Sequence, residues 1–275
     1  TYWNAVLLGL VQGVAEFLPI SSSGHLAVLQ NFLAIGDMEN HMLFDVLLHL
    51  GTLAAVILAF WKDVREVVTE FARMLHIRRT PRGMKPNRRE RRLISFLIIA
   101  TLPLIPAVFL SNVVESLYQN TFFIGFAFIL TGFLLFAADR MGHGNKDERS
   151  STTADALVVG LAQAVAVVPG LSRSGTTISF GMLRGFERSF AVKFSFLLSI
   201  PAVLGANLVS LIKVFSTGVE WSYVPMYLVG VACAFVSGYF AIYFLRLVVQ
   251  RGKFGGFCYY CWGAGLVTLL LSLIS

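Results

Sequence analysis

The chain has 275 residues, of which 56% are hydrophobic and 13% charged, and its mean hydropathy is +0.74. Soluble domains carry about 25% charged residues, so this composition excludes a soluble protein and indicates an integral membrane protein. The net charge of +7 comes largely from residues 62–92, which hold 11 of the 22 lysines and arginines. Positive charge gathers in cytoplasmic loops, so we interpret this stretch as a solvated cytoplasmic loop next to anionic lipid, not as a nucleic-acid site.

Apolar segments predict six membrane spans and two interrupted pairs. A hydrocarbon core about 30 Å thick needs roughly 20 apolar residues, a length approached by residues 42–61, 93–111, 122–138, 188–212, 225–246 and 258–274. The interrupted pairs are 5–18 with 25–35, and 155–168 with 176–186. Proline, glycine and serine separate the members of each pair. Short helices that stop inside apolar sequence predict re-entrant hairpins, whose irregular backbone is tolerated only where protein or a wet cavity surrounds it.

The basic loop fixes the direction of every segment. With residues 62–92 in the cytoplasm, 42–61 runs inward, and the first hairpin enters from outside while the second enters from inside. Each half then holds one hairpin and three spans, an odd number, so the halves have opposite orientations. We therefore predict an all-α, single membrane domain, residues 1–275, in which pseudo-repeats 1–138 and 155–275 form an inverted-topology repeat. The C-terminus and a central cavity should face the outside.

Residues 9–24 and 160–175 align without a gap and carry the polar side chains of both hairpins. Ionised residues at membrane depth are functional candidates by default, and Glu16, His25 and Arg173 lie at such positions. Ser22 and His25 are three residues apart, so the imidazole could accept the hydroxyl proton, and a guanidinium suits phosphate oxygens. Helix starts bind anions, so phosphoryl transfer fits best. The candidate phosphate-binding residues at these helix starts are Ser21, Ser23, Gly24, Ser172, Ser174 and Gly175.

Structural interpretations of the same residues stay open. The serines could cap helices, Arg173 and Glu16 could form an ion pair without catalytic work, and His25 could be a packed core residue. Asp45 and His49 are weaker candidates for a supporting role near the site.

Two stretches of this chain, Gln12 to His25 and Pro169 to Thr177, resemble the signature motifs of the bacterial undecaprenyl-diphosphate phosphatase family, also known as bacitracin-resistance proteins. The resemblance covers essentially the whole chain. It implies an enzyme of the bacterial cytoplasmic (inner) membrane that hydrolyses undecaprenyl diphosphate to undecaprenyl phosphate at the outer face. That reaction recycles the lipid carrier for peptidoglycan synthesis and confers bacitracin resistance. The implied partners are the polyprenyl diphosphate and membrane lipids, and a homodimer stays open.

Carried onto this sequence, the resemblance gives Glu16, Ser22, His25 and Arg173 the catalytic roles, and it adds Gln12 and Thr177 to the candidate phosphate-binding residues. Ser22 would attack the phosphate that Arg173 neutralises, while His25 takes the hydroxyl proton and Glu16 orients His25. In the alternative mechanism, His25 and Glu16 activate water. Gln12 stands where many members carry a second Glu, so no cofactor is firmly predicted, and a weakly held Mg²⁺ or Ca²⁺ stays open. The alternative function is a carrier or flippase of prenyl phosphates with the same inverted-repeat fold.

Overall fold

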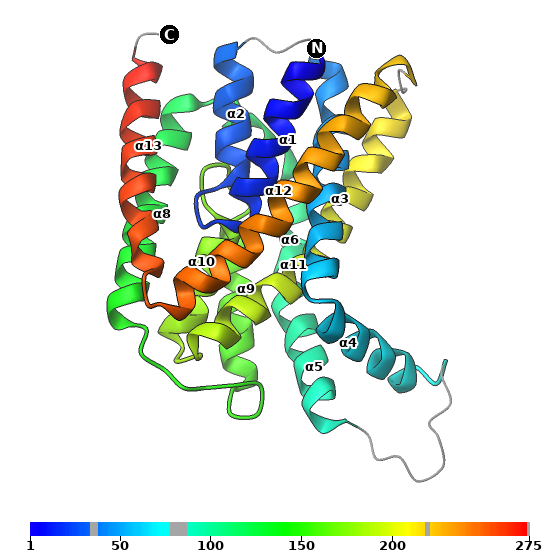
Figure 1. Cartoon of the computed structure of the whole chain (residues 1–275), viewed down its shortest axis with the longest axis vertical. Helices are drawn as coiled ribbons and strands as arrows, with labels where there is room; N and C mark the ends of the chain where they lie inside the picture. Colours follow the sequence, from blue (N-terminus) through cyan, green and yellow to red (C-terminus); the bar gives the residue numbers. More distant parts are fainter. Residues whose placement is uncertain (34–37, 78–86, 218–220, 274–275) are drawn as a thin grey trace.

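The computed structural model describes residues 1–33, 38–77, 87–217 and 221–273, and within them the chain is helical apart from one isolated bridge. Most of the helices lie side by side and run roughly along the long axis of the bundle (Figure 1). Their bounds are α1 Tyr2–Phe17, α2 Ser22–Leu33, α3 Met38–Ala59, α4 Trp61–Met74, α5 Arg88–Thr101, α6 Leu104–Val108, α7 Ser111–Tyr118, α8 Thr121–Met141, α9 Thr153–Val165, α10 Arg173–Leu183, α11 Arg188–Thr217, α12 Val224–Gln250 and α13 Phe257–Ser272, with short 3-10 turns η1 Trp221–Tyr223 and η2 Phe254–Gly256.

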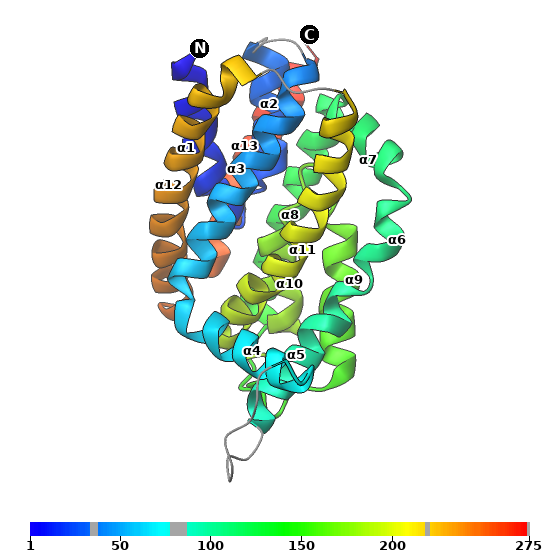
Figure 2. The same cartoon turned by 90° about the vertical axis from the view of Figure 1, so that its right-hand side faces the viewer.

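Five stretches of the described chain are long and apolar enough to cross a membrane: Arg88–Val108, α8, α11, Trp221–Gln250 and Phe254–Ser272. The bent pair of α3 and α4 raises the number to six. These stretches coincide with the six predicted spans. The spans alternate in direction around the bundle, and both termini lie at the same end (Figures 1 and 2). The protein is therefore a multi-pass membrane protein.

The start of the predicted loop 62–92 is instead a helix. α4 turns by 91° from α3 and extends sideways at the end of the bundle opposite the termini (Figure 1). Its apolar side chains gather on one face and its charged residues on another, because Val64, Val67 and Val68 recur at helical spacing. The basic side chains of Arg78, Arg79, Arg82 and Lys85 lie outside the described residues.

The predicted span 93–111 is also interrupted. α5 ends at Thr101, and Pro103 and Pro106 accompany the break before and within α6. Proline removes a backbone donor and crowds the preceding turn. The chain then continues through α7 to the start of α8, where the Asn120 side chain accepts a hydrogen bond from the Phe123 amide and caps the helix.

The two hairpins enter the bundle from opposite ends, as the inverted topology predicts. α1 and α2 come from the end that holds the termini, and α9 and α10 come from the other end (Figure 1). α9 starts in a capping box, in which the Thr152 and Asp155 side chains each bond the other's backbone amide. The irregular turns of both hairpins lie inside the bundle. Buried ionisable groups in those turns therefore lie at membrane depth.

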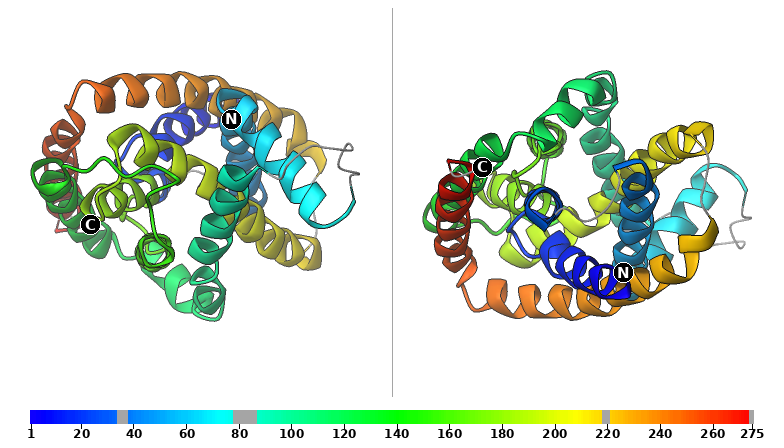
Figure 3. Two further views of the ribbon diagram at one scale, coloured as in Figure 1. Left: turned by 90° about the horizontal axis from the view of Figure 1, so that it is seen from below. Right: turned by 90° about the horizontal axis from the view of Figure 1, so that it is seen from above.

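Close packing on α12 positions the first hairpin. α1 lies beside α12 in two perpendicular views (Figures 2 and 3). A Cβ built at Gly9 would lie 2.3 Å from the Gly230 carbonyl oxygen, and one built at Gly13 would lie 2.0 Å from the Ser237 hydroxyl. Any larger residue at these two positions would push the helices apart. The glycines therefore fix how deeply α1 reaches into the bundle.

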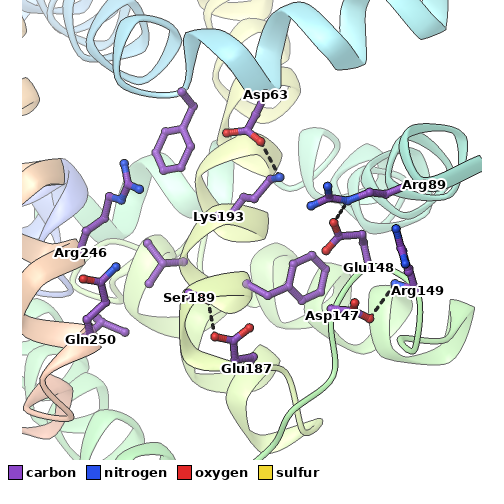
Figure 4. A pocket seen from close by; sticks show the side chains of 14 residues that line it. Asp63, Arg89, Asp147, Glu148, Arg149, Glu187, Ser189, Lys193, Arg246 and Gln250 are labelled. Carbon is purple, nitrogen blue, oxygen red and sulfur yellow. Dashed lines mark hydrogen bonds and ion pairs between the residues drawn. The ribbon is translucent and has the colours of Figure 1, made fainter. Parts of the chain in front are cut away.

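A polar cavity of ≈ 480 Å³ lies at the end of the bundle where α4 leaves α3 (Figure 4). Lys193 pairs with Asp63 at 2.5 Å, and Arg89 pairs with Glu148. Charges in the lining balance, with cations Arg89, Arg149, Lys193 and Arg246 and carboxylates Asp63, Asp147, Glu148 and Glu187. The ion pairs in this lining connect the ends of neighbouring helices. The motif residues do not line the cavity, so it is separate from the candidate active site.

Candidate active site

The two hairpin turns repeat the same hydrogen bonds. In the first, the Gly24 amide donates to Ser21 Oγ at 3.3 Å; in the second, the Gly175 amide donates to Ser172 Oγ at 3.1 Å. Ser172 is thereby the N-cap of α10. Ser23 and Ser174 each lie 3.3 Å, hydroxyl to hydroxyl, from the capping serine of their own turn. The capping interpretation is therefore correct for Ser21 and Ser172, whereas Ser23 and Ser174 contact the hydroxyl of the capping serine and not a helix amide.

The turns also interlock through their glycines. A Cβ at Gly24 would lie 2.9 Å from the Cα of Gly170, and a Cβ at Gly175 would lie 3.1 Å from the Cβ of Pro19. Pro19 and Gly170 are equivalent positions of the sequence repeat. Each glycine thus faces the other repeat at the equivalent point, as a two-fold axis between the turns requires. The motifs, far apart in sequence, form one site.

Glu16, at the end of α1, is the centre of that site. Its carboxylate forms an ion pair with Arg173 through Oε1 and accepts a hydrogen bond from Ser22 Oγ at 2.6 Å through Oε2. Gln12 donates a further hydrogen bond to Oε2 at 3.1 Å. Glu16, Ser22 and Gln12 are all buried. Ser22 and Arg173 occupy equivalent positions of the repeat, so the two copies supply different groups to the same carboxylate.

The predicted proton transfer from Ser22 to His25 is wrong in its geometry. His25 Nδ1 lies 2.7 Å from the Ser21 carbonyl oxygen, and Nε2 lies 2.8 Å from the Tyr260 hydroxyl. Both ring nitrogens are therefore occupied, and the Ser22 hydroxyl donates to Glu16 instead. Ser21, just before α2, has φ 70, a left-handed conformation that is strained for serine. That backbone places the Ser21 carbonyl against the imidazole.

His49 of α3 lies closer to the site than its weak sequence signal indicated. Its Nε2 is 3.8 Å from Glu16 Oε2, and its Nδ1 is 2.8 Å from the Asp45 carbonyl oxygen. The spacing of Asp45 and His49 was the only pointer to this contact. The Asp45 carboxylate accepts a hydrogen bond from the Gln30 side chain at 3.3 Å.

Thr177 is held by protein groups rather than left free for a ligand. Its Oγ1 donates to the Arg173 carbonyl at 2.9 Å and lies 2.6 Å from Ser195 Oγ on α11. Ser174 Oγ donates to the Leu18 carbonyl at 3.3 Å, which ties the second turn to the first. These contacts explain how Arg173 is oriented. They give Thr177 and Ser174 a role in shaping the turn, and their predicted phosphate contacts stay predictions.

The described residues provide no group of three His, Cys, Asp or Glu side chains placed to hold a metal ion. Glu16 already has a guanidinium, a hydroxyl and an amide as partners. This donor set does not fit a divalent cation at Glu16, because the positive charge of Arg173 already lies there.

Fold and site together define a multi-pass membrane protein with a buried serine, a carboxylate and a guanidinium at the meeting point of two helix starts, an arrangement suited to phosphoryl transfer. Comparison with known proteins is more specific. The family model "Bacitracin resistance protein BacA" matches residues 5–267, so this chain belongs to that family.

Similar proteins named undecaprenyl-diphosphatase span nearly the whole chain. The one from Alkaliphilus metalliredigens is 41% identical over 276 residues and covers 100% of both chains. Those from Halothermothrix orenii and Syntrophotalea carbinolica are 37% and 41% identical, covering 98% and 96% of this chain and 98% and 97% of their own.

Proposed function

We propose that this chain is an undecaprenyl-diphosphatase, which hydrolyses undecaprenyl diphosphate to undecaprenyl phosphate and inorganic phosphate. The observation that carries the proposal is the convergence of Ser22 and Arg173 on Glu16. This single site offers a nucleophile, a base in contact with it and a cation that binds phosphate. The names of the full-length relatives support the choice of substrate.

Glu16 is the base in the first step. The hydroxyl proton of Ser22 moves to Glu16 Oε2 as Ser22 Oγ forms a bond to the terminal phosphorus. The bond from that phosphorus to the bridging oxygen breaks, and the electron pair leaves with undecaprenyl phosphate. A base in hydrogen-bond contact with the nucleophile is the arrangement that such a step needs.

The shared carboxylate couples proton transfer to phosphate binding. Once Glu16 takes the proton it is neutral, so its ion pair with Arg173 is lost and the guanidinium is free to hold two phosphate oxygens. The starts of α2 and α10 add positive dipole ends nearby. The positive charge thus becomes available as negative charge develops on the transferred group.

Water completes the reaction. Its oxygen forms a bond to the phosphorus of the phosphoserine as the bond from phosphorus to Ser22 Oγ breaks. Ser22 Oγ takes the proton from the Glu16 carboxyl group, and the attacking water keeps one proton in the departing phosphate and releases the other to solvent. The alternative route, in which Glu16 activates water and Ser22 is only a donor, lacks the phosphoserine. Rapid acid quenching with terminally labelled substrate separates the two, because the covalent route leaves label on the peptide that contains Ser22.

Phosphate release by purified protein tests the function itself. Undecaprenyl diphosphate and its C15 analogue should both yield phosphate, and Ser22→Ala should lower kcat by about 1,000-fold or more. Ser23→Ala is the matched comparison: it removes a hydroxyl one residue away and should cost about tenfold at most. If the folded wild-type protein released phosphate from neither substrate, the assignment would be disproved.

For localisation we propose the bacterial cytoplasmic membrane, with the site open to the periplasm or exterior and pseudo-repeats 1–138 and 155–275 inverted about it. The proposal is supported by the described basic residues of α4, of the start of α5 and of the end of α12, which lie at the end of the bundle opposite the termini (Figure 1). A cysteine at Gln119 should react with an impermeant maleimide in intact cells, whereas one at Arg251 should not. The reverse pattern would overturn the orientation.

A further inference from the structure

The last helix contributes a side chain to the site that no motif indicates. The Tyr260 hydroxyl, on α13, lies 2.8 Å from Nε2 of His25, and the two rings stack with centroids 5.7 Å apart and an interplanar angle of 17°. The thiol of the next residue, Cys261, donates to the Pro19 carbonyl at 3.5 Å. Two successive residues of α13 therefore contact the first hairpin turn.

The partners of the imidazole determine its tautomer. The carbonyl oxygen of Ser21 can only accept a hydrogen bond, so Nδ1 of His25, 2.7 Å away, must carry a proton. In the neutral ring, Nε2 then has a lone pair and no hydrogen. The Tyr260 hydroxyl is therefore the donor in the second contact. Phe128 of α8 packs edge-on against the same ring, with centroids 4.9 Å apart, and adds an apolar restraint.

We propose that Tyr260 is a positioning residue of this site: the Ser21 carbonyl sets the Nδ1–H tautomer of His25, and the Tyr260 hydroxyl donates to Nε2 and fixes the direction of that nitrogen. The proposal rests on the proposed function. Since Nδ1 is committed to Ser21, Nε2 is the ring nitrogen at which His25 contacts substrate or exchanges a proton. Tyr260 is 49% exposed, so its hydroxyl has room to turn aside when substrate approaches. Nε2 of His25 is then free to contact the substrate.

Tyr260→Phe tests the role because it keeps the stacked ring and removes only the hydroxyl. We expect kcat to fall about three- to tenfold, in line with one hydrogen bond, with KM changed less than twofold. Tyr259→Phe is the matched control: Tyr259 is 69% exposed, and its ring packs on Trp262 rather than in the site. Tyr259→Phe should leave both constants unchanged. An unaltered kcat in folded Tyr260→Phe would overturn the proposal.

A double variant shows whether Tyr260 acts through His25. In a His25→Ala background, Tyr260→Phe should have no further effect on kcat, since the imidazole it positions is gone. A general packing role would lower kcat again by the same factor. Equal losses in both backgrounds would therefore contradict the positioning role.

The imidazole itself gives a readout that does not depend on turnover. In protein with ¹⁵N-labelled histidine, the His25 resonances, identified by their loss in His25→Ala, should show a protonated Nδ1. Tyr260→Phe should shift Nε2 and leave Nδ1 protonated. A wild-type spectrum of the Nε2–H tautomer would disprove the proposal. Because this spectrum needs no activity, a wild type that releases no phosphate would count against the function and not against the hydrogen bond.

Discussion

The two hairpin turns share a backbone design and differ in chemistry. Both close with a glycine amide bonded to a serine hydroxyl three residues earlier. The first turn holds Ser22 and His25 at the positions where the second holds Arg173 and Thr176. In the second turn, the Thr176 hydroxyl is buried and has no hydrogen-bond partner among the described residues, whereas His25 has two. The repeat thus supplies a common scaffold, and reactivity has been divided between its copies.

The helices before the turns differ in the same way. Gln12 donates to Glu16, whereas its counterpart Gln163 donates to the Ala100 carbonyl at 3.3 Å. The reason is that Val167, not a carboxylate, stands at the position equivalent to Glu16. One carboxylate serves both copies. Changes at equivalent positions should therefore have very unequal effects.

After Ser22→Ala, the largest expected effect is that of Glu16→Gln. The amide has nearly the same shape but accepts no proton from Ser22, and it leaves the Arg173 charge unpaired. We expect kcat to fall by about 100-fold or more, the range for loss of a general base. Phosphate release measures it, and Val167→Ala, at the equivalent position, provides the comparison. If kcat fell by less than fivefold in folded Glu16→Gln, another group would have to take the proton.

Arg173→Lys comes next. Lysine keeps the charge but loses the planar fork that holds two oxygens at once. We expect activity to drop by at least tenfold, as kcat/KM for the C15 diphosphate will show. The ion pair with Glu16 should survive as a simple charge pair, so the melting temperature should change little. Wild-type activity in this variant would support a structural ion pair.

Gly24→Ala should disturb the meeting of the turns more than the chemistry. The added methyl would lie 2.7 Å from the Phe128 ring and 2.9 Å from the Gly170 backbone. Overpacking of this kind costs about 1–3 kcal/mol, measurable as a lower midpoint of unfolding in detergent. Gly175→Ala is the matched variant and should cost less, because its nearest neighbours are at 3.1 Å. Equal costs would argue that the turns are looser than the contacts indicate.

Thr176→Val should have the smallest effect. Valine has nearly the same shape, and the hydroxyl it removes is buried without a partner. Replacing such a group is neutral or stabilising by up to about 1 kcal/mol, and phosphate release should stay within twofold of wild type. His25→Ala at the equivalent position should lower activity clearly. A marked loss in Thr176→Val would show instead that this hydroxyl binds substrate.

Much of the fold could be predicted because apolar length and helix breakers are local properties. The six spans, both hairpins and their opposite directions follow from them. α4 could not be predicted, since its polar sequence merges into the basic run. Its apolar face can be recognised only in the folded protein, where it lies beside α5 and α11. The break at Pro103 was concealed by continuous hydrophobicity.

The site shows a similar limit. The sequence repeat correctly predicted that Glu16, Ser22 and Arg173 lie together. The spacing of three residues between Ser22 and His25 wrongly predicted a hydrogen bond between them. That spacing places side chains side by side within a helix, whereas Ser22 is the first residue of α2 and follows a left-handed residue. His49 and Tyr260 reach the site through tertiary packing, for which the sequence carries little or no local signal.

The packing of α1 on α12 has a consequence for biosynthesis. α1 is synthesised before α12, yet Gly9 and Gly13 fit against Gly230, Ser237 and Gly238, which are synthesised more than 200 residues later. Contacts between such distant parts of a chain form late. The first hairpin is too short to span the bilayer by itself, so it must remain unpacked in the translocon or lipid until α12 is inserted. Assembly of the active site is consequently one of the last events in the formation of this protein.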